Sequence, residues 1–178
     1  LTERNEGTYN RIRTLPVRYI TILWGKIVVY ASICLLQLIL MIITGMYLLP
    51  LIYGMPPLEL GSNIFALVCA AFSSAFAAIG FGLLVGTFAS TQSQAGIFGS
   101  FMVLILAILG GIFLPVYMMP GPMQAASIVS PVRWGVDSFL DIFVREATID
   151  VIGVNLIRLN VFFVVSLLIA LLTFVRRK

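Results

Sequence analysis

Two long uncharged stretches constrain this chain more than any other feature of its sequence. Lys26 and Glu59 enclose the first stretch, Glu59 and Arg133 enclose the second, and neither contains Asp, Glu, Lys or Arg. A helix that crosses a lipid bilayer needs about 20 predominantly apolar residues. The first stretch can therefore hold one membrane span, and the second can hold two spans and the turn between them.

A further apolar stretch near the C-terminus completes the expected topology. The predicted spans cover about residues 20–49, 62–89, 95–114 and 152–175. Proline and glycine at Pro50, Gly54 and Pro115 mark the breaks after the first and third spans. The predicted fold class is all-α, a polytopic transmembrane helical bundle over residues 20–178 that follows a cytoplasmic segment at residues 1–19.

The composition agrees with this prediction and argues against several classes of protein. Hydrophobic residues make up 61% of the 178 residues and charged residues only 10%, whereas soluble domains contain about 45–50% apolar and about 25% charged residues. A water-soluble enzyme, a disordered tail and a disulfide-stapled scaffold are poorly compatible with such figures. The two cysteines, Cys34 and Cys69, lie inside apolar runs and are expected to be small buried hydrophobes.

The side chains that most catalytic centres need are missing from the sequence. The chain contains no histidine, which removes the commonest general base and the commonest metal ligand. It has no P-loop motif that could hold ATP and no pair of carboxylates within a span. We therefore expect no catalytic, cofactor or metal site in this chain, and a transporter subunit, a channel part or a membrane scaffold as its function.

Residues 115–150 do not resemble a simple loop between spans. Ser130 as a capping residue, followed by Pro131 at the first helical position, is a favourable helix start. Charged residues then recur every four positions, which predicts the ion pairs Arg133–Asp137 and Asp141–Arg145, with apolar residues largely on the other side. The pattern predicts an amphipathic helix of about four turns that lies at the membrane surface or dips partly into it.

The distribution of basic residues predicts the orientation of the chain. Five lysines and arginines lie in the segment that ends at Lys26 and three close the chain, whereas the predicted outer segments contain only Arg133 and Arg145. The positive-inside rule then places both ends in the cytoplasm. We expect the protein to lie in the plasma membrane, which is the inner membrane of a bacterium. Because these charges flank spans, the formal charge of +4 is not the footprint of a nucleic-acid partner.

Arg158 is an unusual charge inside the last apolar stretch. It can be an interfacial arginine whose side chain reaches the outer boundary of the hydrocarbon. It can also be a functional intramembrane charge.

A series of small residues runs every four positions through the second span. Its members are Ser62, Ala66, Ala70, Ser74, Ala78, Gly82, Gly86 and Ser90. Small residues allow helices to approach closely in a membrane. Four residues overshoot one helical turn by about 40°, so one straight neighbour cannot touch the whole series. Packing within the chain is one interpretation, and a dimer seam or the wall of a conduit is the other.

The order of several local motifs resembles one transporter family. The N-terminal Glu3-x-x-x-Gly7-Thr8, then Pro16 and Gly25-Lys26 before a long span, resembles the E-x-x-x-G-T…P…G-K pattern of ATP-binding-cassette (ABC) export permeases of the type-2 class. Gln94 before the third span resembles the glutamine turn of these permeases. The sequence from Gly111 to Pro115, then Met119-Pro120 and Ser130–Trp134, resembles their outer hairpin.

The resemblance implies an assembly larger than this chain. Members of the family have six spans, so this sequence, which begins with Leu rather than Met and shows no signal peptide, is expected to be the C-terminal part of a longer protein. Two permease copies or halves assemble, as a homodimer or a heterodimer, with two cytoplasmic ABC ATPase subunits or domains. ATP and magnesium would be bound by that ATPase, and membrane lipids would surround the spans.

The resemblance also implies roles for two groups of residues. The ATPase-coupling group is Glu3, Glu6, Gly7, Thr8, Arg11, Pro16 and Lys26. The outer-hairpin or gate group is Pro115, Met119, Pro120, Pro131, Arg133 and Trp134. Two simpler interpretations stay open. The first group can be a juxtamembrane basic segment that binds anionic lipid, and the second can be an interfacial helix with no gating role.

The predicted function is therefore export of a hydrophobic or amphipathic substrate, such as a drug, a lipid or a lipid-linked glycan. The chain would form the membrane-spanning permease subunit, and a separate ATPase would hydrolyse the ATP. The alternative is a membrane anchor or scaffold subunit that does not transport. A path lined by leucine, isoleucine, phenylalanine and glycine does not identify a substrate.

Overall fold

The computed structural model describes residues 19–54, 56 and 63–176. Within these ranges the chain is helical and contains no strand, which confirms the predicted all-α class. The elements are α3 (Tyr19–Ile43), a π-helical turn η1 (Thr44–Leu48), α4 (Leu49–Tyr53), α5 (Ile64–Phe88), α6 (Gln92–Leu109), a 3-10 turn η2 (Val116–Met118), α7 (Gly121–Ser127), α8 (Pro131–Arg145) and α9 (Ile149–Arg176).

Four segments of the described chain are long and apolar enough to cross a membrane. They are Ile27–Tyr53, Ile64–Phe88, Gln92–Leu109 and Ile149–Thr173. The predicted polytopic bundle is thus confirmed as a set of apolar helices.

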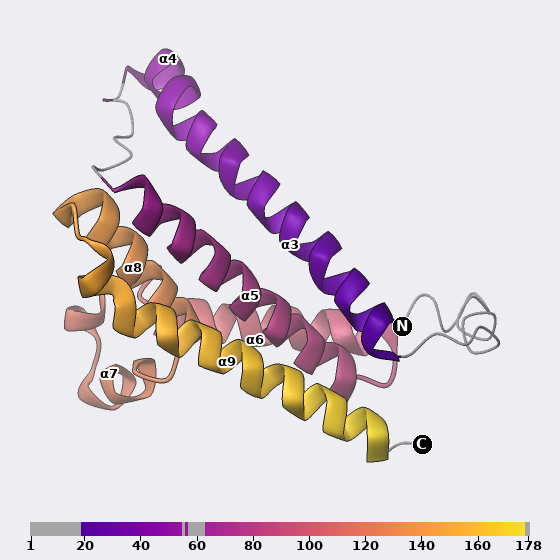
Figure 1. Ribbon diagram of the computed structural model, residues 1–178. Coiled ribbons are helices and arrows are strands. Elements are labelled where there is room, and N and C mark those ends of the chain that lie inside the picture. Colours follow the sequence, from indigo (N-terminus) through magenta and orange to yellow (C-terminus); the bar gives the residue numbers. More distant parts are fainter. Residues whose placement is uncertain (1–18, 55, 57–62, 177–178) are drawn as a thin grey trace.

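The long helices alternate in direction (Figure 1). The start of α3, the turn between α5 and α6, and the end of α9 lie at one end of the bundle, which we call the terminal end. The short helix α7 and the start of α9 lie toward the opposite end, which we call the hairpin end. The start of α3 and the end of α9 therefore lie on the same side of the bundle, as an even number of spans requires.

The first span continues beyond the predicted break at Pro50. The helix widens into the π-turn η1, and Pro50 then occupies the first turn of α4, where a missing N–H is tolerated. The helix ends at Gly54, which has φ of +63° and donates its N–H to the carbonyl of Pro50. The glycine conformation, rather than the proline, ends the span.

Side-chain caps define the turn between α5 and α6. Asn63 accepts the Ala66 N–H at 3.1 Å and begins α5. Thr91 accepts the Gln94 N–H at 3.1 Å, and the Gln94 side chain accepts the Ser90 N–H at 2.8 Å. This reciprocal arrangement is close to a capping box, and it starts α6 at Gln92, slightly before the predicted Ala95.

Helix α5 is the central element of the bundle. At the hairpin end its Ala66, Leu67 and Ala70 pack with Ile142 of α8 and Ile152 of α9 in one buried cluster. Toward the terminal end, Ile79 packs with Ile27 of α3 in a second cluster. Small side chains on α5 allow these close approaches, as expected for helices that pack in lipid.

Two contacts between α5 and α9 show how close these helices lie. The Asn160 side-chain amide donates to the Ser73 hydroxyl at 2.9 Å, and the rings of Phe76 and Phe163 stack with centroids 5.3 Å apart. Gly80 faces the Phe163 backbone, because a Cβ built on Gly80 would lie 3.1 Å from the Phe163 Cα. The α5–α9 pair therefore packs closely at Gly80, where any larger residue would require its α9 neighbours to move by a few tenths of an ångström.

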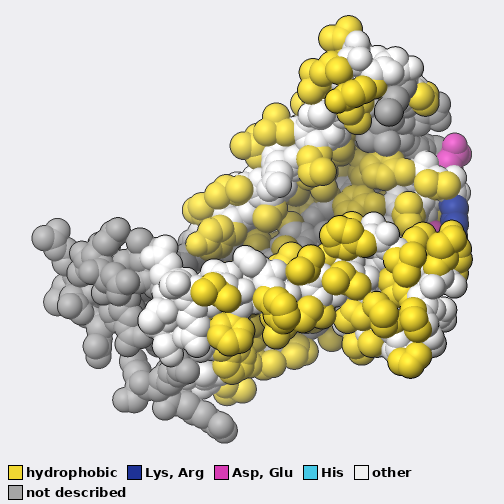
Figure 2. Space-filling view, turned by 180° about the vertical axis from the view of Figure 1, so that it is seen from behind, with side chains coloured by type: hydrophobic (Ala, Val, Ile, Leu, Met, Phe, Trp, Pro, Cys, Tyr) yellow, Lys and Arg dark blue, Asp and Glu magenta, His cyan; other side chains and the backbone are white. Residues whose placement is uncertain are grey.

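Much of the outer surface is apolar. Large hydrophobic side chains along α3 and α6, such as Met41, Leu51, Ile97 and Phe101, are exposed. Figure 2 shows apolar side chains spread over the visible face, with charged side chains gathered at the end away from the terminal residues. Such a surface is what a bilayer-embedded bundle presents to lipid tails.

Candidate functional site

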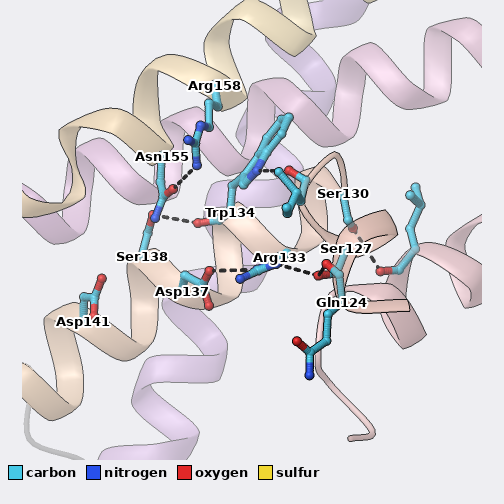
Figure 3. Close-up of polar contacts among 12 residues, drawn as sticks. Gln124, Ser127, Ser130, Arg133, Trp134, Asp137, Ser138, Asp141, Asn155 and Arg158 are labelled. Atoms are coloured by element: carbon cyan, nitrogen blue, oxygen red, sulfur yellow. Dashed lines mark hydrogen bonds and ion pairs between the residues drawn. The ribbon is translucent and has the colours of Figure 1, made fainter. Parts of the chain in front are cut away.

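At the hairpin end, α7, α8 and the first turns of α9 carry a group of polar side chains that contact one another (Figure 3). Proline determines where these short helices begin. Pro122 lies in the first turn of α7, and Pro131 occupies the first turn of α8. A proline in the first helical turn costs no hydrogen bond, because that N–H has no partner within the helix.

Helix α8 is the amphipathic helix that the sequence predicts. It runs from Pro131 to Arg145, and both expected ion pairs form, with Arg133 Nε 3.4 Å from the Asp137 carboxylate and Arg145 Nη1 2.5 Å from the Asp141 carboxylate. Its inner face does not lie free at a membrane surface. Gly135, Ser138 and Ile142 are buried against the rest of the bundle.

The hairpin, which is formed by α7 and α8, is attached directly to the end of α6. The Ser130 hydroxyl, expected from sequence to cap α8, instead donates to the Leu106 carbonyl of α6 at 3.2 Å. That carbonyl also accepts the Gly110 N–H at 2.7 Å. A Cβ on Gly110 would lie 2.6 Å from Cγ1 of Val132 in α8, so α8 rests on the backbone of the α6 end.

The end of α6 differs from the prediction for this reason. The helix stops at Leu109 and not near Leu114, because Gly110 is followed by Gly111 with φ of +84°. A left-handed conformation is favourable only for glycine and turns the chain out of the helix. The proline at Pro115 then lies in an extended segment rather than at a helix end.

Arg133 is held by two neighbours at the start of α8. Its Nη1 donates to the Ser127 hydroxyl at 2.5 Å, and its Nε donates to Asp137. Ser127 in turn donates to the Gln124 carbonyl at 2.7 Å. The guanidinium thus links α7 to α8 in a defined position.

Trp134 also links the two short helices. Its indole N–H donates to the Ile128 carbonyl at 2.9 Å, which satisfies a carbonyl at the C-terminal end of α7. The Trp134 carbonyl accepts the hydroxyl of the buried Ser138 at 2.7 Å. The ring is therefore fixed beside Arg133.

Arg158 extends from α9 toward α8 in this region (Figure 3). Its Nη1 donates to the Asn155 side chain at 3.4 Å, and no carboxylate of the described residues lies within ion-pair distance of it. A cavity of about 270 Å³ is lined by Ile128, Arg133, Trp134, Asp137 and Arg158. The cavity brings two guanidinium groups, one carboxylate and one indole ring to a shared space.

The outer-hairpin residues proposed from sequence divide into two sets in the structure. Pro131, Arg133 and Trp134 belong to the α8 start described above, and Met119 is buried, with its carbonyl accepting the Gln124 side chain at 2.8 Å. The remaining two, Pro115 and Pro120, are exposed and precede η2 and α7.

The small-residue series on α5 does not contact one continuous neighbour. Ala66 and Ala70 are buried, Ser74 has a buried hydroxyl near Gly135 of α8, and Ala78 is exposed. The last glycines of the series, Gly82 and Gly86, have open space where a Cβ would be. The burial changes along the series because each step of four residues overshoots one helical turn by about 40°, so that successive members face different directions.

The ATPase-coupling group expected from sequence lies mostly outside the described residues. Glu3, Glu6, Gly7, Thr8, Arg11 and Pro16 all precede residue 19. Lys26 lies in the first turns of α3, at the terminal end. The role of this group stays a prediction.

Two residues of the hairpin end, Ser127 and Asn155, were not singled out from sequence. Ser127 gains its importance from the side chain of Arg133, and Asn155 from that of Arg158. The adjacent Gly110 and Gly111 have a visible signal, since two glycines at the end of an apolar run suggest a helix end.

Comparison with known proteins gives one family. Residues 1–144 match the family model described as "ABC-2 type transporter". The chain is also 28% identical over 151 residues to the protein named "Probable multidrug ABC transporter permease YbhR" from Escherichia coli strain K12, and equally to its counterpart in strain O157:H7. The aligned region covers 84% of this chain and 39% of each relative, so the chain spans well under half of their length. No solved structure matches.

Proposed function

The chain belongs to the ABC-2 type transporter family, and we propose that it forms the C-terminal membrane-spanning part of an ABC export permease. The observation that carries the proposal is the match of residues 1–144 to this family, on a chain with four apolar helices and a packed hairpin at one end. The sequence contains no P-loop motif, and in this proposal a separate ABC ATPase supplies the energy.

The arrangement of the bundle supports different roles for its two ends, with ATPase contact at one end and covering of the exit at the other. The segment with Glu3, Glu6 and Arg11 precedes α3 and would contact the ATPase beyond the terminal end, in the cytoplasm. The hairpin of α7 and α8 would cover the exit at the opposite end. Because α8 rests on α5, α6 and α9 at once, a movement of the spans would be transmitted to the hairpin through contacts such as Gly110–Val132.

The proposed substrate is a hydrophobic or amphipathic molecule. The two Escherichia coli relatives carry names that describe a multidrug permease, and the described spans expose mainly apolar side chains. A drug, a lipid or a lipid-linked glycan would be compatible with such surfaces. A second copy of the permease, identical or related, would complete the path.

Co-purification with an ABC ATPase, followed by ATP hydrolysis in liposomes, tests this proposal. The full-length permease should retain an ABC ATPase on purification, and candidate substrates should raise the hydrolysis rate of the reconstituted complex. The alternative, a subunit that only anchors or organises other proteins, predicts hydrolysis that no substrate changes.

A further inference from the structure

We propose that the cavity between α7, α8 and α9 binds the phosphate-bearing headgroup of an anionic phospholipid. The cavity is defined by Ile128, Arg133, Trp134, Asp137 and Arg158, as described above. The inference concerns a binding site at the hairpin end and does not depend on which substrate the protein transports.

The charges that line the cavity favour an anion. Arg133 and Asp137 form an ion pair and largely neutralise each other. Arg158 contributes a second guanidinium from another helix and is bonded only to the neutral Asn155 among the described residues. The lining thus has one net positive charge, and a single phosphodiester would balance it.

The geometry of the cavity also suits a phosphate. Guanidinium groups donate several hydrogen bonds in one plane and match phosphate oxygens better than a point charge does. Arg133 is already held in place by Ser127 and Asp137, so little side-chain entropy would be lost on binding. A volume of about 270 Å³ is sufficient for a headgroup but is too small for a whole lipid.

An apolar groove on α9 begins next to this cavity. Arg158, Val161 and Val165 follow one another at i, i+3 and i+7 and so share one face of the helix. Val161 and Val165 also line a separate groove of about 380 Å³ on α9, together with Leu156, Ile157, Asn160 and Val164. A lipid with its phosphate at Arg158 would place an acyl chain along this groove.

The position of Arg158 explains why a lipid, rather than a free anion, is the proposed ligand. On α9 it is flanked by exposed apolar side chains, including Val154, Ile157 and Val161. An arginine in such surroundings lies where headgroup phosphates meet acyl chains, because a long basic side chain on a membrane helix packs its apolar stem on the helix and extends its charge to the headgroup region.

The test measures lipid binding to the full-length protein, purified in detergent, by native mass spectrometry. The probes are dioleoylphosphatidylglycerol, dioleoylphosphatidylcholine and inorganic phosphate. We expect phosphatidylglycerol to bind more tightly than phosphatidylcholine, and Arg158→Gln to weaken phosphatidylglycerol binding by about tenfold, the factor that one charge-assisted hydrogen bond typically contributes. Arg158→Lys, which keeps the charge, should reduce the affinity for phosphatidylglycerol by a smaller factor.

Two matched variants make the result specific to the cavity. Arg145→Gln removes an exposed arginine from the other end of α8 and should leave the affinity unchanged. Asp137→Asn removes the carboxylate that competes with the phosphate and should tighten binding by about two- to fivefold. If the cavity instead held the ammonium group of a zwitterionic lipid, Asp137→Asn would weaken binding.

Three outcomes would overturn the proposal. Arg158→Gln and Arg145→Gln could bind phosphatidylglycerol equally well, which would mean that the lipid binds elsewhere. Asp137→Asn could weaken binding. Millimolar inorganic phosphate could displace the signal completely, which would mean that the site recognises a soluble anion and not a lipid. Elution of each variant as a single peak in size-exclusion chromatography would show that it is folded.

Discussion

At the scale of single residues, the glycines of α5 differ sharply in their surroundings. A Cβ on Gly80 would lie 3.1 Å from the Phe163 backbone and 3.2 Å from Ser166, whereas one on Gly82 would meet no atom within 4 Å. Overpacking against a backbone atom costs about 1–3 kcal/mol. Alanine at a free helical position is neutral or favourable, because glycine is a poor helix former.

These surroundings give a prediction with a control on the same helix. Gly80→Ala should lower the thermal stability of the purified protein, by about 1–2 kcal/mol relative to Gly82→Ala. Thermal unfolding in detergent, followed for both variants and the wild type, measures the difference. Equal stability of the two variants would show that α5 and α9 do not pack as closely as described.

The residues of the proposed coupling segment give a functional prediction. Glu6→Ala and Arg11→Ala change charges on a segment expected to face water, where substitutions usually alter stability by about ±0.5 kcal/mol. The amount of permease in the membrane should therefore stay unchanged. Transport per assembled complex should fall, because a contact with the ATPase is lost. Both quantities must be measured on the same preparation. Normal transport at normal level would make the segment a basic lipid anchor only.

At the scale of elements, the docking of α8 on the end of α6 depends on one glycine. A Cβ on Gly110 would lie 2.6 Å from the Val132 side chain and 2.9 Å from the Leu106 carbonyl. The hairpin would have to move away and lose the bond from Ser130 to that carbonyl.

This contact predicts that Gly110→Ala loosens the hairpin. Limited proteolysis should cut the segment between α6 and α8 faster in this variant, and the protein should be about 1–3 kcal/mol less stable. The control is Gly121→Ala in the same hairpin, since a Cβ there meets nothing within 4 Å. Identical cleavage of Gly110→Ala and wild type would contradict the described packing.

Elements with a strong local signal could be predicted from the sequence. The uncharged stretches gave the spans, and the charges at Arg133, Asp137, Asp141 and Arg145 gave α8 with both of its ion pairs. Rules based on single residues, such as proline ending a helix, gave the wrong helix end where the backbone conformation determines it. A π-turn carries the first span past Pro50 to Gly54.

The candidate site was only partly predictable for a related reason. Arg133, Trp134 and Arg158 stood out as unusual residues, but their meeting in one cavity depends on how α8 packs against α9. The bond from Ser130 to Leu106 joins residues that are 24 positions apart. Sequence spacing contains no information on such a contact. The series of small residues on α5 indicated that close packing would occur, but not which helices would pack there.

At the scale of the whole molecule, the start of α3 and the end of α9 lie at one end of the bundle and the hairpin lies toward the other. The excess of basic residues near the chain ends predicts that the terminal end faces the cytoplasm. An orientation of this kind is also what an exporter with a cytoplasmic ATPase would need.

Labelling with a membrane-impermeant thiol reagent tests the orientation. In a background with Cys34 and Cys69 replaced, cysteine at the exposed positions Tyr53 and Ala125 should be labelled in intact cells. Cysteine at the exposed Ser93 should be labelled only after the membrane is opened. Labelling of position 93 in intact cells would refute the four-span topology.

Transport in proteoliposomes is the decisive test of whether this chain forms part of a path driven by ATP. The full-length permease and its ATPase would be reconstituted with a fluorescent lipophilic drug or a labelled lipid, and movement across the membrane would be followed on addition of ATP and magnesium. We expect movement that requires ATP and stops when the P-loop lysine of the ATPase is replaced. An assembled complex that hydrolyses ATP but moves no amphipathic substrate faster than the P-loop variant would contradict it.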